Sequence, residues 1–172
     1  MNAIGHFRTI TRHRHEVIKN CFKAGIGFQG LFHDLSKYSY TEFSVGAKYY
    51  RGYKSPNDVE RELYGYSLAW LHHKGRNKHH FEYWYDYDSN SREIVPVEMP
   101  LRYLKEMLCD RIAASKIYQG KKYTQNHPLE YFNFGKARNY MHKKNANTME
   151  QWLEMLAQKG EDELFKYIRT LK

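Results

Sequence analysis

Apolar residues recur every three or four positions along most of the chain, which is the pattern of amphipathic helices. The clearest stripe lies between Phe7 and about Ala24 and contains Phe7, Ile10, Val17, Ile18, Cys21 and Phe22. Shorter helices are predicted over 29–37 and 40–50. The first half of the chain is therefore expected to be helical.

Helix start signals continue this pattern into the middle of the chain. Ser55-Pro56-Asn57 opens a predicted helix that runs to His73, with Asn57 and Glu60 spaced as a capping box. Pro100 suits a first helical position. The stripe that follows it passes through Asp110 and contains Leu101, Leu104, Met107, Leu108, Ile112 and Ala113.

The C-terminal part carries three further helix signals. Pro128 opens a helix to about Met141, and Thr148 with Gln151 forms a second capping box. A last helix is predicted over 161–171. Its aromatic residues are interpreted as packing residues; they are Tyr131, Phe132, Phe134, Trp152 and Phe165.

One segment has a different period. Apolar residues alternate from Phe81 to Tyr87, and the turn-rich residues 88–91 separate them from a second apolar run over 94–97. This pattern predicts a small β-hairpin near 81–97. We therefore expect an all-α fold of about seven helices with at most this hairpin. A single domain spanning 1–172 is predicted, with a motif-bearing core over 7–118 and C-terminal helices over 127–172 packed on it.

Composition narrows the class of protein. The 172 residues are 41% hydrophobic and 27% charged, and the mean hydropathy is −0.86. No run approaches the ~18 apolar residues of a membrane span, and the N-terminus lacks a signal-peptide core. We expect no membrane contact and a cytoplasmic protein, in which Cys21 and Cys109 are reduced core residues.

Charge and histidine content point toward anionic ligands and metal. The net charge is +9, from 28 basic and 19 acidic residues, which favours a phosphate ester or nucleic acid as partner. Five of the ten histidines lie between positions 33 and 80. Their spacing is more informative than the charge.

The sharpest local motif is His33-Asp34-Leu35-Ser36-Lys37. Imidazole nitrogen and carboxylate oxygen together suit Fe, Mn, Co, Ni or Zn. On a helix Lys37 would share the face of His33 and Asp34, where its ammonium group could hold a substrate phosphate beside the metal. A polar turn with an exposed His-Asp pair is the alternative interpretation.

A second motif contains two histidine pairs, His72-His73 and His79-His80, which are separated by the basic segment 74–78. Gly75 and Asn77 favour a bend that would bring the pairs together. Arg76 within this segment could bind an anionic substrate. A basic surface loop that binds metal weakly is the alternative.

Two further candidates lie on predicted helices. Asp110 interrupts an apolar stripe, so it needs a partner to be buried, and that partner could be Arg111 or a metal ion. His13 lies on the side of Phe7, Ile10 and Val17, whereas His15 points about 160° away at 100° per residue. His13 is therefore the preferred inward ligand, with His15 as the substitute.

The order His, His-Asp, His, His-His, Asp resembles the HD-domain superfamily of metal-dependent phosphohydrolases. His13-Arg14-His15-Glu16-Val17 matches its HxxxV motif, and the segment 110–115 is similar to its closing Asp followed by a small residue. The runs GLFHDLSKYSYTEF and HHKGRNKHHFEYWYD are also similar to a small uncharacterised bacterial and phage family related to HD proteins. A Gly-Tyr-Pro tripeptide is absent, so a cyclic-dinucleotide substrate is not supported.

The resemblance implies a specific ligand set. The first metal would be held by His13, His33, Asp34 and Asp110. His73, or alternatively His72, would join His79 and His80 at a second metal, with Asp34 bridging. Lys37, with Arg76 as a second cation, would contact the phosphate. One or two divalent ions are expected, and they could be Fe, Mn, Co, Ni, Zn or Mg.

The implied function is hydrolysis of a nucleotide or other small phosphate ester, with Asp34 and Lys37 as catalytic residues. An HD-type di-iron oxygenase would use the same ligand order. A non-catalytic nucleic-acid-binding module is a third interpretation, with the aromatic strip 81–87 as a stacking surface. Glu82, Asp86 and Asp88 would repel a phosphate backbone, so packing is preferred for these aromatics. The sequence leaves the substrate, metal identity and oligomeric state open.

Overall fold

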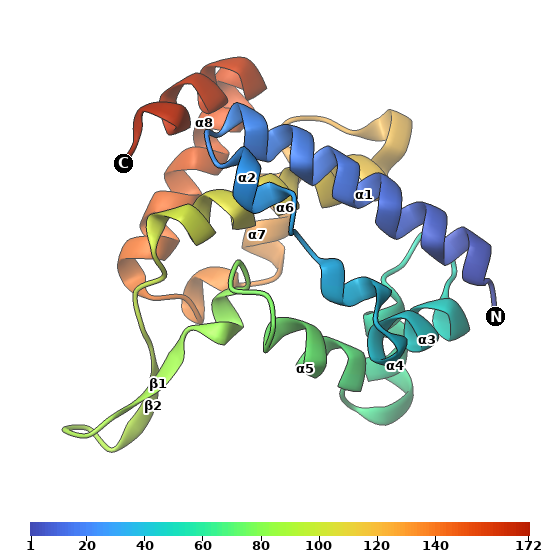
Figure 1. Cartoon of the computed structure of the whole chain (residues 1–172). Coiled ribbons are helices and arrows are strands. Elements are labelled where there is room, and N and C mark those ends of the chain that lie inside the picture. Colours follow the sequence, from blue (N-terminus) through green and yellow to red (C-terminus); the bar gives the residue numbers. More distant parts are fainter.

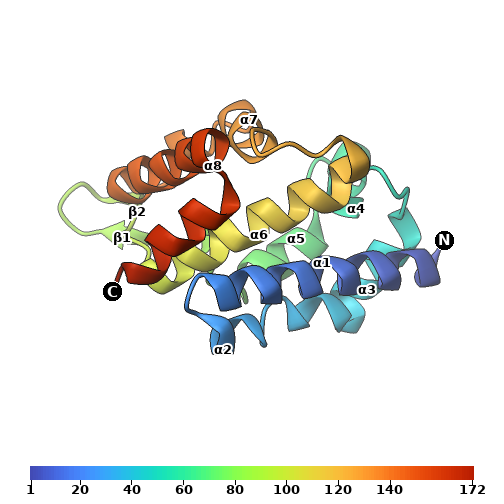
Figure 2. The same ribbon diagram turned by 90° about the horizontal axis from the view of Figure 1, so that it is seen from above.

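Two long antiparallel helices, α1 (Ala3–Lys23) and α6 (Leu101–Gln119), pack side by side at the centre of the computed structural model, which describes all 172 residues (Figures 1 and 2). The C-terminal helix α8 (Lys143–Thr170) packs against both of them. The buried apolar residues where they meet include Val17, Cys21, Leu108, Cys109, Ile112, Trp152, Leu153 and Leu156. Each of these residues is at most 2% exposed, so most of the predicted apolar stripes form the core, but Phe7 (49%) and Phe22 (57%) of the first stripe are exposed.

The remaining helices surround this centre. Helices α3 (Tyr40–Tyr49), α4 (Pro56–Tyr64) and α5 (Leu68–Lys74) form a group in which α3 contacts α1, α4 and α5. Helix α7 (His127–Phe134) packs against α6 and α8. The helix α2 (Gly27–Gly30) is a single turn against α1. Short 3-10 helices complete the set: η1 (Leu35–Tyr38), η2 (Phe81–Tyr83), η3 (Gly120–Lys122) and η4 (Ala137–Asn139).

The predicted hairpin is confirmed. Strand β1 (Tyr85–Asp88) pairs antiparallel with β2 (Glu93–Pro96), with Tyr85 opposite Pro96. The hairpin extends away from the helical body (Figure 1). Phe81 and Trp84 at its base pack against the core, as expected, whereas Tyr87 is 57% exposed.

The mostly helical prediction is confirmed, but four predicted segments were wrong in detail. The helix predicted from Pro128 to about Met141 ends at Phe134 and is followed by a turn and η4. The helix predicted over 29–37 is instead α2, an irregular turn and η1. The helix predicted up to His73 is two helices, because Gly65 adopts a left-handed φ of 80° and ends α4. Residues 161–171 continue α8, which is kinked at Gly160 (φ 87°).

Both predicted capping boxes were also wrong. Glu60 is buried and accepts a hydrogen bond of 2.5 Å from the Ser67 hydroxyl, and Ser67 in turn caps α5 by accepting from the Trp70 amide. Glu60 therefore links α4 to α5 instead of capping its own helix with Asn57. Thr148 lies inside α8 and donates to the Lys144 carbonyl at 3.0 Å.

Of two predictions about side-chain burial, the one for the C-terminal aromatic residues had a mixed outcome and the one for the cysteines is confirmed. Phe132, Trp152 and Phe165 are buried, but Tyr131 is 65% exposed and Phe134 is 86% exposed. Both cysteines are free and buried, as expected. None of the helices is long and apolar enough to cross a membrane.

Candidate metal centre

The His33-Asp34 motif lies in an irregular segment between α2 and η1. Asp34 adopts a left-handed φ of 53°, a conformation that Asp and Asn tolerate better than most residues. Arg14 of α1 holds this segment by donating from Nε to the His33 carbonyl at 3.1 Å and from its guanidinium group to the Leu31 carbonyl. The turn directs the Asp34 carboxylate inward, where the residue is only 1% exposed.

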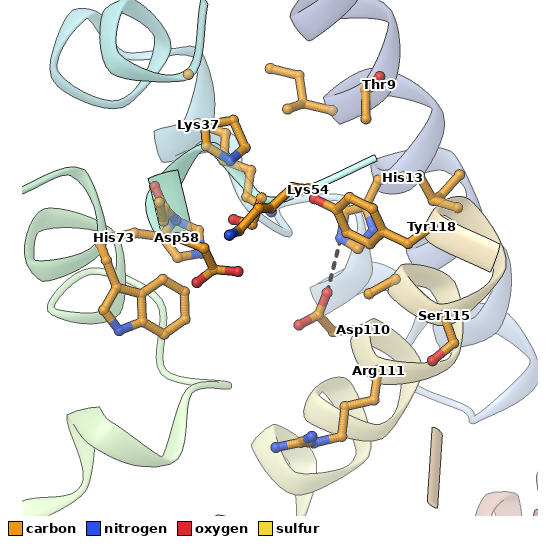
Figure 3. Close-up of a pocket in the computed structure, with 18 of the residues that line it drawn as sticks. Thr9, His13, Lys37, Lys54, Asp58, His73, Asp110, Arg111, Ser115 and Tyr118 are labelled. Carbon is orange, nitrogen blue, oxygen red and sulfur yellow. Dashed lines mark ion pairs between the residues drawn. The ribbon is translucent and has the colours of Figure 1, made fainter. Parts of the chain in front are cut away.

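Asp34 Oδ2 faces the first group of metal-ligating side chains. This group consists of His13 from α1, His33, Asp34 and Asp110 from α6, and its ligand atoms all lie within 4.8 Å of one another. His33 Nε2 is 3.1 Å from Asp34 Oδ2. His13 Nε2 is 2.9 Å from Asp110 Oδ1, the pair marked by the dashed line in Figure 3. Residues from three separate parts of the sequence therefore converge on one point.

Asp34 Oδ1 faces a second group, made of Asp34, His73, His79 and His80. His73 Nε2 is 3.3 Å and His79 Nε2 is 3.4 Å from this oxygen. His73 Nε2 lies 2.9 Å from His80 Nε2. Asp34 therefore belongs to both groups and offers a different oxygen to each.

Several of the converging atoms lack the hydrogen bonds that buried polar atoms normally make. His13 Nε2, His33 Nε2, His79 Nε2 and both carboxylate oxygens of Asp34 are buried, and none of them has a partner in good hydrogen-bond geometry. Their contacts are ion pairs within the site, including the one from Lys37 to Asp34 Oδ2. Leaving such atoms unsatisfied is costly. Divalent metal ions would satisfy all five, and the imidazole–carboxylate donor set suits them. The residues present thus fit one or two such ions.

Two further carboxylates orient the histidines from outside. Glu106 of α6 lies 2.8 Å from His33 Nδ1 and 3.2 Å from His79 Nδ1. Glu42 of α3 lies 2.8 Å from His73 Nδ1. A carboxylate that binds Nδ1 leaves Nε2 free to coordinate metal, as second-shell carboxylates do in known metal sites.

The two ligand groups open onto a cavity of about 590 Å³. His13, Lys37, His73 and Asp110 lie around it with Arg111 (Figure 3). Its aromatic lining consists of Tyr50, Tyr53, Trp70, Phe81, Tyr118 and Tyr131. The cavity is large enough for a small organic ligand.

The model of one protein family, described as "Family of unknown function (DUF5662)", matches residues 2–155. The chain belongs to this family. The match includes every ligand of both groups and both outer carboxylates. No curated protein and no solved structure matches this DUF5662 protein.

The charge state of the site follows from the mutual contacts of its members. Burial alone would lower the pKa of His33, but the carboxylates of Asp34, Glu106 and Asp110 raise it to about 10. Burial alone would raise the pKa of Glu106, yet its hydrogen bonds with His33 and His79 lower it to about 2. In the metal-free DUF5662 protein, His33 is therefore protonated at neutral pH and Glu106 is ionised.

The other first-group residues are already in the form that binds metal. Burial and the nearby Lys37 ammonium group lower the pKa of His13. The pKa of Asp110 lies well below its usual value because contacts with His13 and His33 outweigh burial. Both side chains can therefore coordinate a cation at neutral pH without losing a proton.

The structure separates the alternatives that the sequence left open. His13 is 7% exposed and lies in the first group, whereas His15 is exposed. His73 lies in the second group, and His72 instead contacts Glu42 at 2.7 Å. Arg76 is exposed and does not line the cavity, so the structure does not bring it to the candidate site.

Sequence reasoning missed Glu42 and Glu106. Glu106 lies four residues before Asp110 in the same apolar stripe, so both acids face inward from α6. That spacing was the available signal. Glu42 had no comparable signal, because it is one acid in a short polar helix.

Replacing Glu106 with glutamine is expected to weaken metal binding about 10- to 100-fold, the usual effect of losing an outer carboxylate. The amide no longer stabilises the orientation of His33 and His79 through a charged hydrogen bond. Competition with a chelating dye measures the affinity. Glu130→Gln, an exposed residue of α7, is the matched control. Equal metal affinity in Glu106→Gln and the wild type would contradict the role of Glu106.

Proposed function

We propose that this protein is a metal-dependent phosphohydrolase that acts on a nucleotide or another small phosphate ester. The observation that carries the proposal is the sharing of Asp34 by two ligand groups that reach one cavity, the first through His13 and Asp110 and the second through His73 and His80. Ions held by these groups would be close neighbours, since Asp34 belongs to both groups. Pairs of ions ~3.5–4 Å apart are typical of phosphatases and nucleases.

Lys37 supplies the positive charge that a phosphate requires beside such a centre. Its Nζ lies 2.6 Å from Asp34 Oδ2, and its side chain remains 27% exposed toward the cavity. Although burial opposes it, the Asp34 carboxylate raises the pKa of Lys37 above its usual value. The ammonium group therefore stays charged and can neutralise phosphate oxygens.

Asp34 and the histidines fix the geometry in which the ester would be held. Divalent ions bound in such a site lower the pKa of coordinated water and polarise phosphoryl oxygens. Glu106 and Glu42 hold the imidazoles that face Asp34. Tyr50, Trp70, Phe81 and Tyr118 line the same cavity and would help to exclude water from a bound ester.

Metal-dependent release of inorganic phosphate tests the proposal. The purified protein is loaded with Mn²⁺, Co²⁺, Ni²⁺, Mg²⁺ or Fe²⁺ and assayed with p-nitrophenyl phosphate and nucleoside monophosphates. We expect phosphate release that EDTA abolishes, and a loss of about 10-fold or more in Lys37→Met, because a charged contact to the phosphate is removed. Lys172→Met, at the C-terminus, is the matched control.

Two other results would point to different functions. Oxygen consumption by the iron-loaded protein without phosphate release would contradict hydrolysis and favour a di-iron oxygenase. Salt-sensitive oligonucleotide binding without any turnover would favour a nucleic-acid-binding protein.

A further inference from the structure

Two charged side chains that line the cavity have no ion-pair partner. The other Lys, Asp and Glu side chains of the lining are each paired: Lys37 with Asp34, Glu42 with His72 and His73, Lys54 with Glu62, Asp58 with Arg61, and Asp110 with His13. Arg111 and Glu82 also line the cavity, but neither takes part in an ion pair or a side-chain hydrogen bond. Arg111 and Glu82 are therefore the charged lining residues whose charge is not balanced by a direct ion pair.

Arg111 follows Asp110 on α6, and its side chain extends along the cavity in Figure 3. Its Nε is buried without a hydrogen-bond partner. The only partner of its guanidinium group is the ring of Phe132, whose centroid is 5.3 Å away. The sequence offered Arg111 as the partner of Asp110, but Asp110 contacts His13 instead. The guanidinium donors are therefore free to bind a ligand.

Glu82 comes from a different element, the 3-10 helix η2 at the base of the hairpin. Its Oε2 is buried and forms no hydrogen bond. A buried carboxylate oxygen and a buried guanidinium nitrogen in one cavity, unpaired with each other, are costly to maintain. A ligand that offers both acceptors and donors would satisfy both of them.

We infer that Arg111 and Glu82 form a second subsite, which binds the organic part of the phosphate ester and makes the enzyme select nucleoside monophosphates. Arg111 donates to carbonyl or ring-nitrogen acceptors of the base, and Glu82 accepts from its amino or imino groups. Phe81 and Tyr131, which also line the cavity, provide aromatic surface for a planar ring. This inference rests on the proposed function, because the phosphate is placed at the metal centre.

The position of Arg111 on α6 is consistent with a phosphate at the metal centre and an organic part at the second subsite. Consecutive helical residues point about 100° apart, so Asp110 faces the ligand group while Arg111 faces the adjacent part of the cavity. A phosphate at the metal centre would therefore leave its organic part beside Arg111. A simple aryl ester would leave both Arg111 and Glu82 unsatisfied.

Substrate selectivity tests the inference. The kcat/KM values of the Mn²⁺-loaded enzyme are compared for nucleoside 5′-monophosphates, ribose 5-phosphate and p-nitrophenyl phosphate. We expect at least one nucleotide to exceed ribose 5-phosphate by about 10-fold or more. Arg111→Met and Glu82→Gln should each reduce that ratio about 10-fold or more, mainly through KM. Arg102→Met, an exposed residue of the same helix, should keep the ratio of the wild type.

Binding measurements separate a failure of this inference from a failure of the proposed function. Calorimetry on the Mn²⁺-loaded protein compares inorganic phosphate with the nucleoside monophosphates and needs no turnover. Tighter binding of a nucleotide, lost in Arg111→Met and Glu82→Gln, would support the subsite even if no ester were hydrolysed. Equal affinity for nucleotide and inorganic phosphate, or unchanged nucleotide binding in both variants, would overturn it, as would equal use of ribose 5-phosphate.

Discussion

Replacing Asp34 with asparagine is expected to remove bound metal from both ligand groups and to abolish metal-dependent phosphate release. Losing an outer carboxylate typically costs 10- to 100-fold in metal affinity, and losing a shared direct ligand should cost more than about 100-fold. Oδ1 faces His73 and His79, whereas Oδ2 faces His33 and His13. One substitution therefore affects both sites.

Asparagine is the informative replacement because it tolerates the left-handed backbone of position 34 and keeps the volume of the side chain. Circular dichroism should show an unchanged helix content, while elemental analysis should show metal loss. Asp162→Asn, whose side chain is 98% exposed, is the matched control and should retain its metal. An Asp34→Asn protein that carries as much metal as the wild type would refute the shared-ligand interpretation.

Periodicity predicted the long elements of the fold and failed where backbone conformation departs from it. The stripes from Phe7 to Phe22 and from Leu101 to Ala113 correspond to α1 and α6, because these helices bury one face against each other. The break at Gly65 was not predicted, since Tyr66 and Leu68 continue the apolar spacing across it. The left-handed Asp34 likewise leaves no trace in the hydrophobic pattern.

The residues of the candidate site were also predicted only in part. Histidine and aspartate in unusual clusters carried enough information to nominate the residues that converge on Asp34. Glu106 and Glu42 were missed because a single acid in a helix is common, and only the tertiary contacts with His33, His79 and His73 reveal the function of these two acids. Arg111 was predicted to pair with Asp110, its neighbour in sequence. In the structure Asp110 contacts His13, and Arg111 lies over the ring of Phe132.

The second large effect is that of pH on metal binding. His33 carries a proton in the metal-free protein up to about pH 10, because Asp34, Glu106 and Asp110 outweigh its burial. Because the pKa of His33 is higher in the fold than in the unfolded chain, protonation of His33 stabilises the metal-free fold. This contribution is complete below about pH 6.5, the pKa of histidine in the unfolded chain, and is lost as the pH rises through about 10. A metal ion at His33 Nε2 must displace that proton, so it competes with the same stabilisation.

The apparent metal affinity should therefore rise about tenfold per pH unit between pH 7.0 and 8.5, and binding should release about one proton from His33. Mn²⁺ titrations in two buffers of different ionisation enthalpy measure both quantities. Glu106→Gln should flatten this dependence, because it removes one of the carboxylates that raise the pKa of His33, while Glu130→Gln should leave it as in the wild type. A metal affinity that stays constant over this window would mean that His33 gives up no proton, and the first ligand group would then have to bind its ion without His33.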